Sequence, residues 1–229
     1  MKNTIKLIGI IALVAMIGFS MAACGGDDTP PVFNGPANLR TTAGTATTVT
    51  ITWDAVSDAT GYKVLNSTTS TVLAENVTGT SYEITGLTAF TRTTIAVRAL
   101  KGGEESQSSI ISVLPHGLTA AGNNIILGTT PTTEGNLSAN SARLFSVAST
   151  ANIDAGQYAI GLRNNGPLTV ILVRGGHEEI DTRSRSDNSN TVAPFPTIRI
   201  PQGIYSVIVR NTGTTAVSIF QVGMQRIGD

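Results

Sequence analysis

The stretch that decides the fold is residues 47–56, which read TTVTITWDAV. Its apolar residues Val49, Ile51 and Trp53 recur at every second position, with threonines between them. Successive side chains of a β-strand point to opposite faces, so this period of two predicts a strand with one buried face. Antiparallel sheets that cover a core on one side and meet water on the other show the same alternation.

The same alternation recurs along the rest of the chain, between short turns rich in Gly, Ser, Thr and Asn. It appears around residues 61–64, 82–84, 95–100, 144–147, 158–162, 198–209 and 220–224. Residues 168–173 are almost continuously apolar, with Leu168, Val170 and Leu172 on one face and Ile171 and Val173 on the other, which predicts a strand buried on both faces. The fold class is therefore predicted as all-β, with two tandem β-sandwich domains after an amino-terminal signal segment.

Residues 36–115 resemble a fibronectin type III domain. The resemblance is carried by Pro36, Leu39, ITWDAV at 51–56, GYKV at 61–64, YEITGL at 82–87 and IAVRAL at 95–100. It implies that Trp53 is the buried tryptophan of the second strand and that Leu87 precedes the sixth. The family usually has a tyrosine where this sequence has Thr93, so we expect its corner hydrogen bond to be lost or replaced and stability to be lower. The expected role of this domain is a spacer or a docking module.

Residues 116–229 resemble bacterial β-sandwich modules of the pre-peptidase C-terminal type. The carriers are NLSANSARLFSV at 136–147, GQYAIGLRN at 156–164, LTVILVRGG at 168–176 and residues 198–222. Pro201, Gly203 and Tyr205 match the turn that leads into a strand in that family. The resemblance implies an accessory domain of the kind found next to secreted enzymes, sometimes linked to glycan or protein binding.

The amino terminus, residues 1–23, has the layout of an export signal. Lys2 and Lys6 precede an apolar run, and small residues follow before Cys24, the only cysteine of the chain. The apolar run at 7–23 is at the lower limit for spanning a bilayer, so a cleaved signal fits it better than a membrane helix. Residues 24–35 are rich in Gly, Asp and Pro and are expected to be a tether.

Met21, Ala22, Ala23 and Cys24 resemble the lipobox of bacterial lipoproteins, although that family more often has Leu at the first of these positions. The resemblance implies that Cys24 is lipidated and becomes the first residue of the mature protein, anchored in the membrane by its acyl chains. In that family, an Asp directly after the cysteine is the signal for retention in the inner membrane. Here Gly25 follows the cysteine and the acids come later, at Asp27 and Asp28. The resemblance therefore favours the outer membrane or cell surface of a bacterial envelope.

Composition excludes several classes of function. Formal net charge is zero and charged residues make up 13%, which argues against nucleic-acid binding. A single cysteine and two histidines leave no basis for an internal disulfide, a zinc site or a cofactor. His116 and His177 are the available imidazoles, and neither a Gly-x-Ser-x-Gly motif nor a phosphate-binding glycine motif accompanies them. The chain is therefore predicted not to be an enzyme.

The connection at 175–196 concentrates charge in the second segment. Its candidate recognition residues are His177, Glu178, Glu179, Asp181, Arg183 and Arg185. Three interpretations stay open: a solvated loop, a calcium-stabilised loop that uses some of Glu178, Glu179, Asp181 and Asp187, and a recognition loop on a rigid scaffold. The spacing fits no full EF-hand pattern.

The function expected from these features is non-catalytic contact with a protein or a glycan by a membrane-anchored lipoprotein. The alternative is an accessory or structural envelope subunit without a discrete ligand of its own. A glycan binder exposes a row of aromatic rings, so burial of Tyr158, Phe195 and Tyr205 would argue against that ligand.

Overall fold

The computed structural model describes residues 33–125, 135–147, 153–185, 193–194 and 196–228, with the backbone alone at 120–124, 193–194 and 219–221. All described strands lie within one compact unit, Asn34–Asp229. No helix occurs among the described residues. The prediction of an all-β fold is confirmed.

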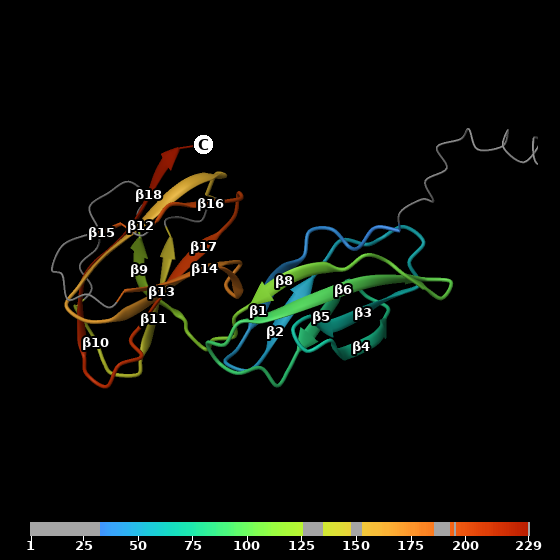
Figure 1. Ribbon diagram of the computed structural model, residues 1–229, viewed down its shortest axis with the longest axis horizontal. Coiled ribbons are helices and arrows are strands. Elements are labelled where there is room, and N and C mark those ends of the chain that lie inside the picture. Colours follow the sequence, from blue (N-terminus) through green and yellow to red (C-terminus); the bar gives the residue numbers. More distant parts are fainter. Residues whose placement is uncertain (1–32, 126–134, 148–152, 186–192, 195, 229) are drawn as a thin grey trace, which may run out of the picture. The chain divides into compact units, whose positions relative to one another are not determined.

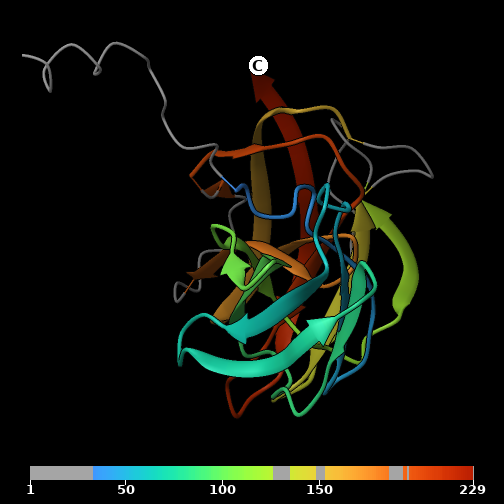
Figure 2. The same cartoon turned by 90° about the vertical axis from the view of Figure 1, so that its right-hand side faces the viewer.

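The first sandwich is built from two antiparallel sheets (Figure 1). One sheet has the order β1-β2-β5, and the other has the order β4-β3-β6-β8 with β7 paired to β6. The hairpin of β3 and β4 faces the viewer in Figure 2. The strands are β1 (Arg40–Gly44), β2 (Val49–Thr52), β3 (Gly61–Asn66), β4 (Thr71–Val77), β5 (Ser81–Ile84), β6 (Thr93–Lys101), β7 (Glu104–Glu105) and β8 (Ser109–Val113).

The core of the first sandwich forms around the stretch 47–56. Val49, Ile51 and Trp53 are all buried, as their alternation predicts. The Trp53 ring packs edge-on against Tyr62, with ring centroids 5.3 Å apart. The hydroxyl of Tyr62 accepts a hydrogen bond from the backbone N–H of Val56 at 2.9 Å. Thr93 pairs with Val113 in the ladder between β6 and β8, and the lower stability expected from this residue stays a prediction.

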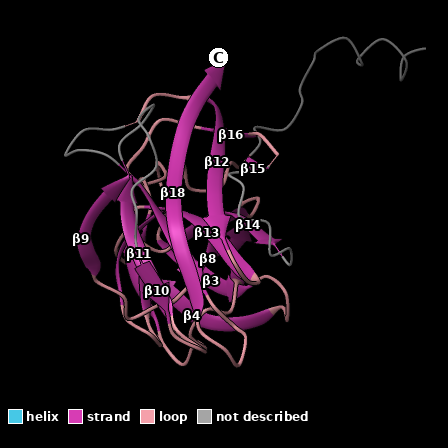
Figure 3. Ribbon diagram, turned by 90° about the vertical axis from the view of Figure 1, so that its left-hand side faces the viewer, coloured by secondary structure: helices cyan, strands magenta, loops and turns pink. Residues whose placement is uncertain are grey.

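The second sandwich also has two sheets, and its strands β12 and β18 run side by side in Figure 3. One sheet has the order β10-β18-β12-β15, with β16 also paired to β12, and the other continues β14-β13-β17-β11-β9. The strands are β9 (Ala120–Ile125), β10 (Gly135–Leu137), β11 (Ala142–Val147), β12 (Gly156–Asn164), β13 (Leu168–Arg174), β14 (Glu178–Arg185), β15 (Ala193–Pro194), β16 (Ile198–Ile200), β17 (Tyr205–Arg210) and β18 (Val217–Gly228).

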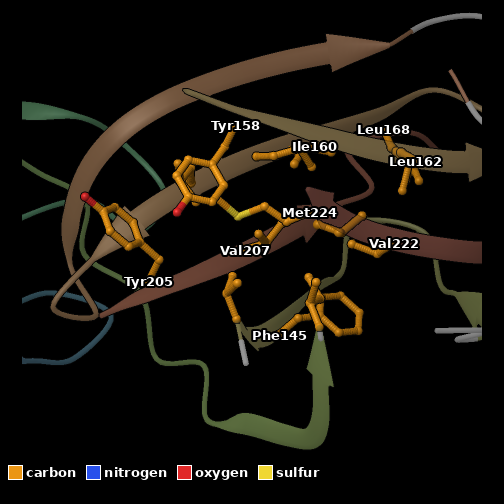
Figure 4. Packing of buried hydrophobic residues seen from close by; sticks show 14 of the residues in the cluster. Phe145, Tyr158, Ile160, Leu162, Leu168, Tyr205, Val207, Val222 and Met224 are labelled. Atoms are coloured by element: carbon orange, nitrogen blue, oxygen red, sulfur yellow. The ribbon is translucent and has the colours of Figure 1, made fainter. Parts of the chain in front are cut away.

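The core of the second sandwich lies between these two sheets. Figure 4 shows Phe145 and Val207 from one sheet facing Tyr158 and Met224 from the other. Two tyrosines bring hydroxyls into this apolar space, and each finds a backbone partner four residues earlier. Tyr158 donates to the carbonyl of Asp154 at 2.9 Å, and Tyr205 donates to that of Pro201 at 2.6 Å. These bonds tie the two turns to the starts of β12 and β17.

Strand β13 is buried on both faces, which confirms the prediction from its continuous apolar run. Leu168, Val170 and Leu172 belong to the core between the two sheets. Ile171 and Val173 point the other way and join a second apolar cluster with Leu114, Leu144 and Ile208, against which Phe90 and Leu118 pack. The outer face of this sheet is therefore covered by residues of the first sandwich and of the segment that follows it.

The prediction of one connection over 175–196 is wrong for its first half. Residues 178–185 form β14, which pairs with β13 from Leu168↔Arg185 to Arg174↔Glu178. Gly175 and Gly176 have φ of 57° and 91°, left-handed values that suit the tight three-residue turn 175–177 between β13 and β14. The sequence pattern hides this strand because Ile180 is its one apolar residue.

We expect Tyr205→Phe to lower the free energy of unfolding by about 1 kcal/mol at neutral pH, because the bond to the carbonyl of Pro201 is lost while the packed ring remains. Burial raises the pKa of Tyr205 to about 12. In the unfolded chain the phenol ionises near the ordinary value of about 10, so stability from the neutral phenol is present below that pH and is lost as the pH rises through the folded pKa.

Urea unfolding of wild type and Tyr205→Phe, at about pH 7 and again at about pH 11, measures both effects. The wild type should lose more stability than the variant between the two conditions. Equal losses would show that Tyr205 does not carry the alkaline sensitivity.

Candidate functional site

The segment after the first sandwich and the β13–β14 turn of the second meet in a continuous backbone junction. Val113, the last residue of β8, pairs with Glu178, the first residue of β14. The next backbone N–H, that of Leu114, donates to the carbonyl of His177 at 2.8 Å. One sheet thus extends from β8 into β14.

Two imidazoles fill the centre of this junction. The rings of His116 and His177 stack with centroids 4.3 Å apart and planes inclined by 25°. Both side chains are buried. His116 Nε2 lies 2.7 Å from the carbonyl oxygen of Gly176, and His177 Nδ1 lies 3.2 Å from that of Leu114. Each ring therefore bonds to a backbone carbonyl within three residues of the other histidine.

Side chains on either side of the imidazoles add further contacts between the two sandwiches. The hydroxyl of Thr41 on β1 lies 3.3 Å from the carbonyl oxygen of Arg174 and 3.2 Å from that of Gly175. The guanidinium of Arg210 lies over the ring of Phe90, 4.7 Å from its centroid. These contacts add polar and cation–π interactions to the apolar packing at Ile171 and Val173.

The predicted recognition residues lie on or beside β14, and their polar groups have partners within the chain. Glu178 pairs with Arg174 at 2.7 Å, Asp181 with Arg183 at 2.7 Å, and Glu179 lies 4.0 Å from Arg92 of the first sandwich. Arg185 donates to the carbonyl of Leu162 at 2.9 Å.

The described residues contain no group of three or more His, Cys, Asp or Glu that could hold a metal ion. Asp187, which the calcium interpretation also invoked, lies outside them. The recognition role of the charged residues stays a prediction.

A notch of about 340 Å³ opens beside this junction. Its walls include Arg40 and Thr41 from the first sandwich and Arg174, Glu178 and Ile204 from the second. Arg174 and Glu178 face each other with two short hydrogen bonds, of 2.8 and 2.7 Å, and the carboxylate raises the pKa of the guanidinium. Ile204 is 57% exposed. The notch therefore combines an apolar contact point with a paired charge.

Sequence reasoning missed most of this site. Arg40, Arg174 and Ile204 are far apart in the chain, and nothing in their local patterns marks them as neighbours. The sequence offers His116 and His177 as the available imidazoles and His177 as a recognition residue, and it does not indicate that the two rings stack. The two glycines before His177 are the one local signal, because consecutive glycines predict a tight turn that could have placed His177 at its end.

The aromatic side chains give no support to a sugar-stacking face. Tyr158 and Tyr205 are each 1% exposed, and their rings lie in the core between the sheets. Phe195 lies outside the described residues. The two tyrosines therefore cannot stack on a glycan ring.

Known proteins match the first part of this arrangement. The family described as fibronectin type III domain matches residues 34–113, the span of β1 to β8. Residues 34–113 form a fibronectin type III domain. The predicted resemblance is confirmed for this segment, whereas the resemblance of 116–229 to pre-peptidase C-terminal modules and the boundary at 115/116 stay predictions.

Two curated relatives share sequence with part of the chain. Chitinase A1 of Niallia circulans is 40% identical over 94 residues, which cover 39% of this chain and 13% of that protein. Tail tube protein gp17.1* of Bacillus phage SPP1 is 42% identical over 83 residues, which cover 36% of this chain and 31% of that protein. The matches thus span less than a third of either relative.

Solved structures give weaker likenesses. A Fn3-like protein from Clostridium thermocellum is 28% identical, with a TM-score of 0.33, over 37% of this chain and 94% of that one. A segment of two fibronectin type III domains from chicken tenascin is 17% identical, with a TM-score of 0.32, over 85% of this chain and all of that one.

The anchor prediction concerns residues that the structure does not describe. Cys24 and the apolar run at 7–23 both lie before residue 33, where the description begins. Within the described ranges, no helix is long and apolar enough to cross a bilayer.

We expect Gly44→Ala to loosen the junction. A β-carbon at residue 44 would come within 2.7–2.8 Å of three ring atoms of His177, and that ring is already stacked against His116. Overpacking of this kind typically costs about 1–3 kcal/mol. Gly79→Ala is the matched control, because a β-carbon there meets nothing within 4 Å. Thermal unfolding of the two variants should show a clear loss at residue 44 only, and equal melting temperatures would contradict the close packing.

Proposed function

We propose that this protein is a non-catalytic bacterial lipoprotein whose docked pair of sandwiches holds a contact site for another protein at the envelope surface. The observation that carries the proposal is the notch beside the junction, because both sandwiches supply its walls. A pocket of about 300 Å³ is at the small end for ligand sites in proteins, and it suits one side chain of a partner better than a large cofactor.

The chemistry of the notch favours a protein partner. Ile204 offers an exposed apolar surface, and Arg174 and Glu178 stand beside it with their charges matched to each other. Protein interfaces commonly combine an apolar centre with hydrogen-bonding groups at the rim. Since Tyr158 and Tyr205 are buried, protein contact is a better interpretation than glycan stacking.

The proposed location at a membrane rests on the amino-terminal sequence. Cys24 follows an apolar run and small residues, and eight residues separate it from residue 33, where the description begins. A lipid on Cys24 would hold the docked sandwiches near a membrane, with residues 24–35 as the tether. Two or more acyl chains give the firm attachment that a single chain does not.

The alternative, an accessory or structural envelope subunit, is favoured by one comparison. The relative named Chitinase A1 is much longer than the segment it shares with this chain, so the shared part is a small fraction of that protein. In this alternative the junction serves only to fix the spacing of the two sandwiches, and the notch contacts nothing.

The anchor is tested by labelling with radioactive or clickable palmitate. We expect the wild type to incorporate label and Cys24→Ser to incorporate none, because the thiol is the acceptor of the diacylglyceryl group in the proposed modification. Matched expression of the two proteins is checked by immunoblot. Label in Cys24→Ser at the wild-type level would overturn the anchor.

The contact site is tested by site-specific photo-crosslinking in the intact cell. We expect p-benzoylphenylalanine in place of Ile204 to form a discrete crosslinked band, because this side chain is at the mouth of the notch. The matched control replaces Val72, which is 41% exposed on β4, with the same amino acid. Absence of a band from position 204, or the same band from position 72, would favour the structural alternative.

A further inference from the structure

The stacked imidazoles of His116 and His177 are buried titratable groups at the junction of the two sandwiches. They lie where the segment after β8 meets the β13–β14 turn, and each ring is fixed by backbone groups rather than by a carboxylate. The same junction contains the apolar residues Leu114, Ile171 and Val173, with polar contacts at Thr41 and a cation–π contact between Arg210 and Phe90 beside them. The imidazoles are thus titratable groups buried at the centre of this junction.

The hydrogen bonds of His116 require a neutral ring. Its Nδ1 accepts the backbone N–H of Leu118 at 3.3 Å, so this nitrogen carries no proton, and Nε2–H donates to the carbonyl of Gly176 at 2.7 Å. His177 donates from Nδ1–H to the carbonyl of Leu114 at 3.2 Å. A second proton on His116 would place two donors, the ring N–H and the N–H of Leu118, against each other.

The charged groups around the rings do not compensate a positive imidazole. The β13–β14 hairpin contributes Arg174 and Glu178, which are paired with each other, and Glu179, which lies near Arg92 from the start of β6. From β1, the neighbours are the uncharged Thr41 and Gly44, while Arg40 pairs with Asp54 at 3.4 Å. The segment at 114–118 carries no charge apart from His116 itself. The carboxylates nearby therefore already have cationic partners.

We propose that His116 and His177 form an acid-sensitive latch that keeps the two sandwiches docked at neutral pH and releases them in the acid range, as the imidazoles take up protons. A second proton on His116 breaks the bond that its Nδ1 accepts from Leu118. A second proton on His177 leaves its bond to Leu114 intact but places a positive charge on a buried ring. Protons on both rings place two positive charges about 4 Å apart in a stack. The undocked arrangement lets both rings reach water and accept protons freely.

The sign of the effect follows from burial. Burial lowers the pKa of both histidines below the model-peptide value of 6.5, and the neighbouring ring lowers that of His116 further. A lowered pKa means that the undocked state binds more protons in the acid range. The stability of docking is therefore present above about pH 6.5 and falls as the pH drops, by up to about tenfold per pH unit for each histidine.

Release uncovers a surface that is closed at neutral pH. The outer face of the second sandwich, with Leu144, Ile171, Val173 and Ile208, loses its cover. The notch loses one of its two walls, since Arg40 and Thr41 come from the first sandwich. The latch does not depend on the notch having a partner, so it stands or falls separately from the proposed contact site.

The test is hydrogen exchange of the full-length chain in detergent, followed by mass spectrometry at several values from about pH 7.5 to about pH 5.5 and corrected for the intrinsic pH dependence of exchange. We expect peptides that contain Leu114, Leu118 and Glu178 to lose protection by tenfold or more across about two pH units, while β12 and β18 keep theirs. A flat wild-type profile at the junction would overturn the latch.

Two conservative variants separate titration from packing. His116→Gln keeps a donor near the position of Nε2, and His177→Asn keeps one near the position of Nδ1, but neither residue titrates. We expect the double variant to show junction protection that no longer depends on pH. The same acid-dependent loss in the double variant would assign the effect to other groups. If the variant fails to fold, as shown by loss of protection in β12 and β18, the wild-type profile alone decides the question.

Discussion

The arrangement of residues 34–229 depends on one constraint: the sheet of β13, β17 and β11 is apolar on both faces. Its inner face is covered by the opposite sheet of the second sandwich, as in any sandwich. The outer face, with Ile171, Val173 and Ile208, needs a second cover, and Leu114, Phe90 and Leu118 provide it. Exposure of such a face to water is unfavourable by about 25 cal/mol for each Å² of apolar area. Docking of the fibronectin type III domain is thus a consequence of the sequence of β13.

The β13–β14 turn makes this docking specific. Apolar surfaces alone allow many relative positions, whereas hydrogen bonds require particular ones. Gly175 and Gly176 bring His177 to the end of β8, where backbone and imidazole bonds fix the register. The charged residues that suggested a recognition loop belong to this same hairpin, and one of them, Glu179, lies near Arg92 of the other sandwich. The β13–β14 hairpin therefore contributes both to the contact between the two sandwiches and to the proposed contact site for another protein.

The comparisons and the structure support different parts of the proposed function. The family model matches the fibronectin type III domain at residues 34–113, and the similarity to Chitinase A1 and to a phage tail tube protein covers 39% and 36% of this chain. The notch, in contrast, needs both sandwiches, so its properties belong to their combination. A buried titratable pair at the same junction offers a way to control that combination through pH.

The sequence by itself determined the local features of this protein. The alternation around Trp53 predicted the strands of the first sandwich, and the continuous apolar run at 168–173 predicted a strand buried on both faces, because side-chain period and burial are properties of neighbouring residues. Only the tertiary structure decided which surface covers Ile171, that residues 178–185 form a strand between β13 and β8, and that His116 stacks on His177. A strand made almost entirely of polar residues has no apolar face to reveal it, and two histidines 61 positions apart become neighbours only when the domains dock. Local sequence patterns show which side chains a segment buries, and long-range contacts decide which other segment covers them.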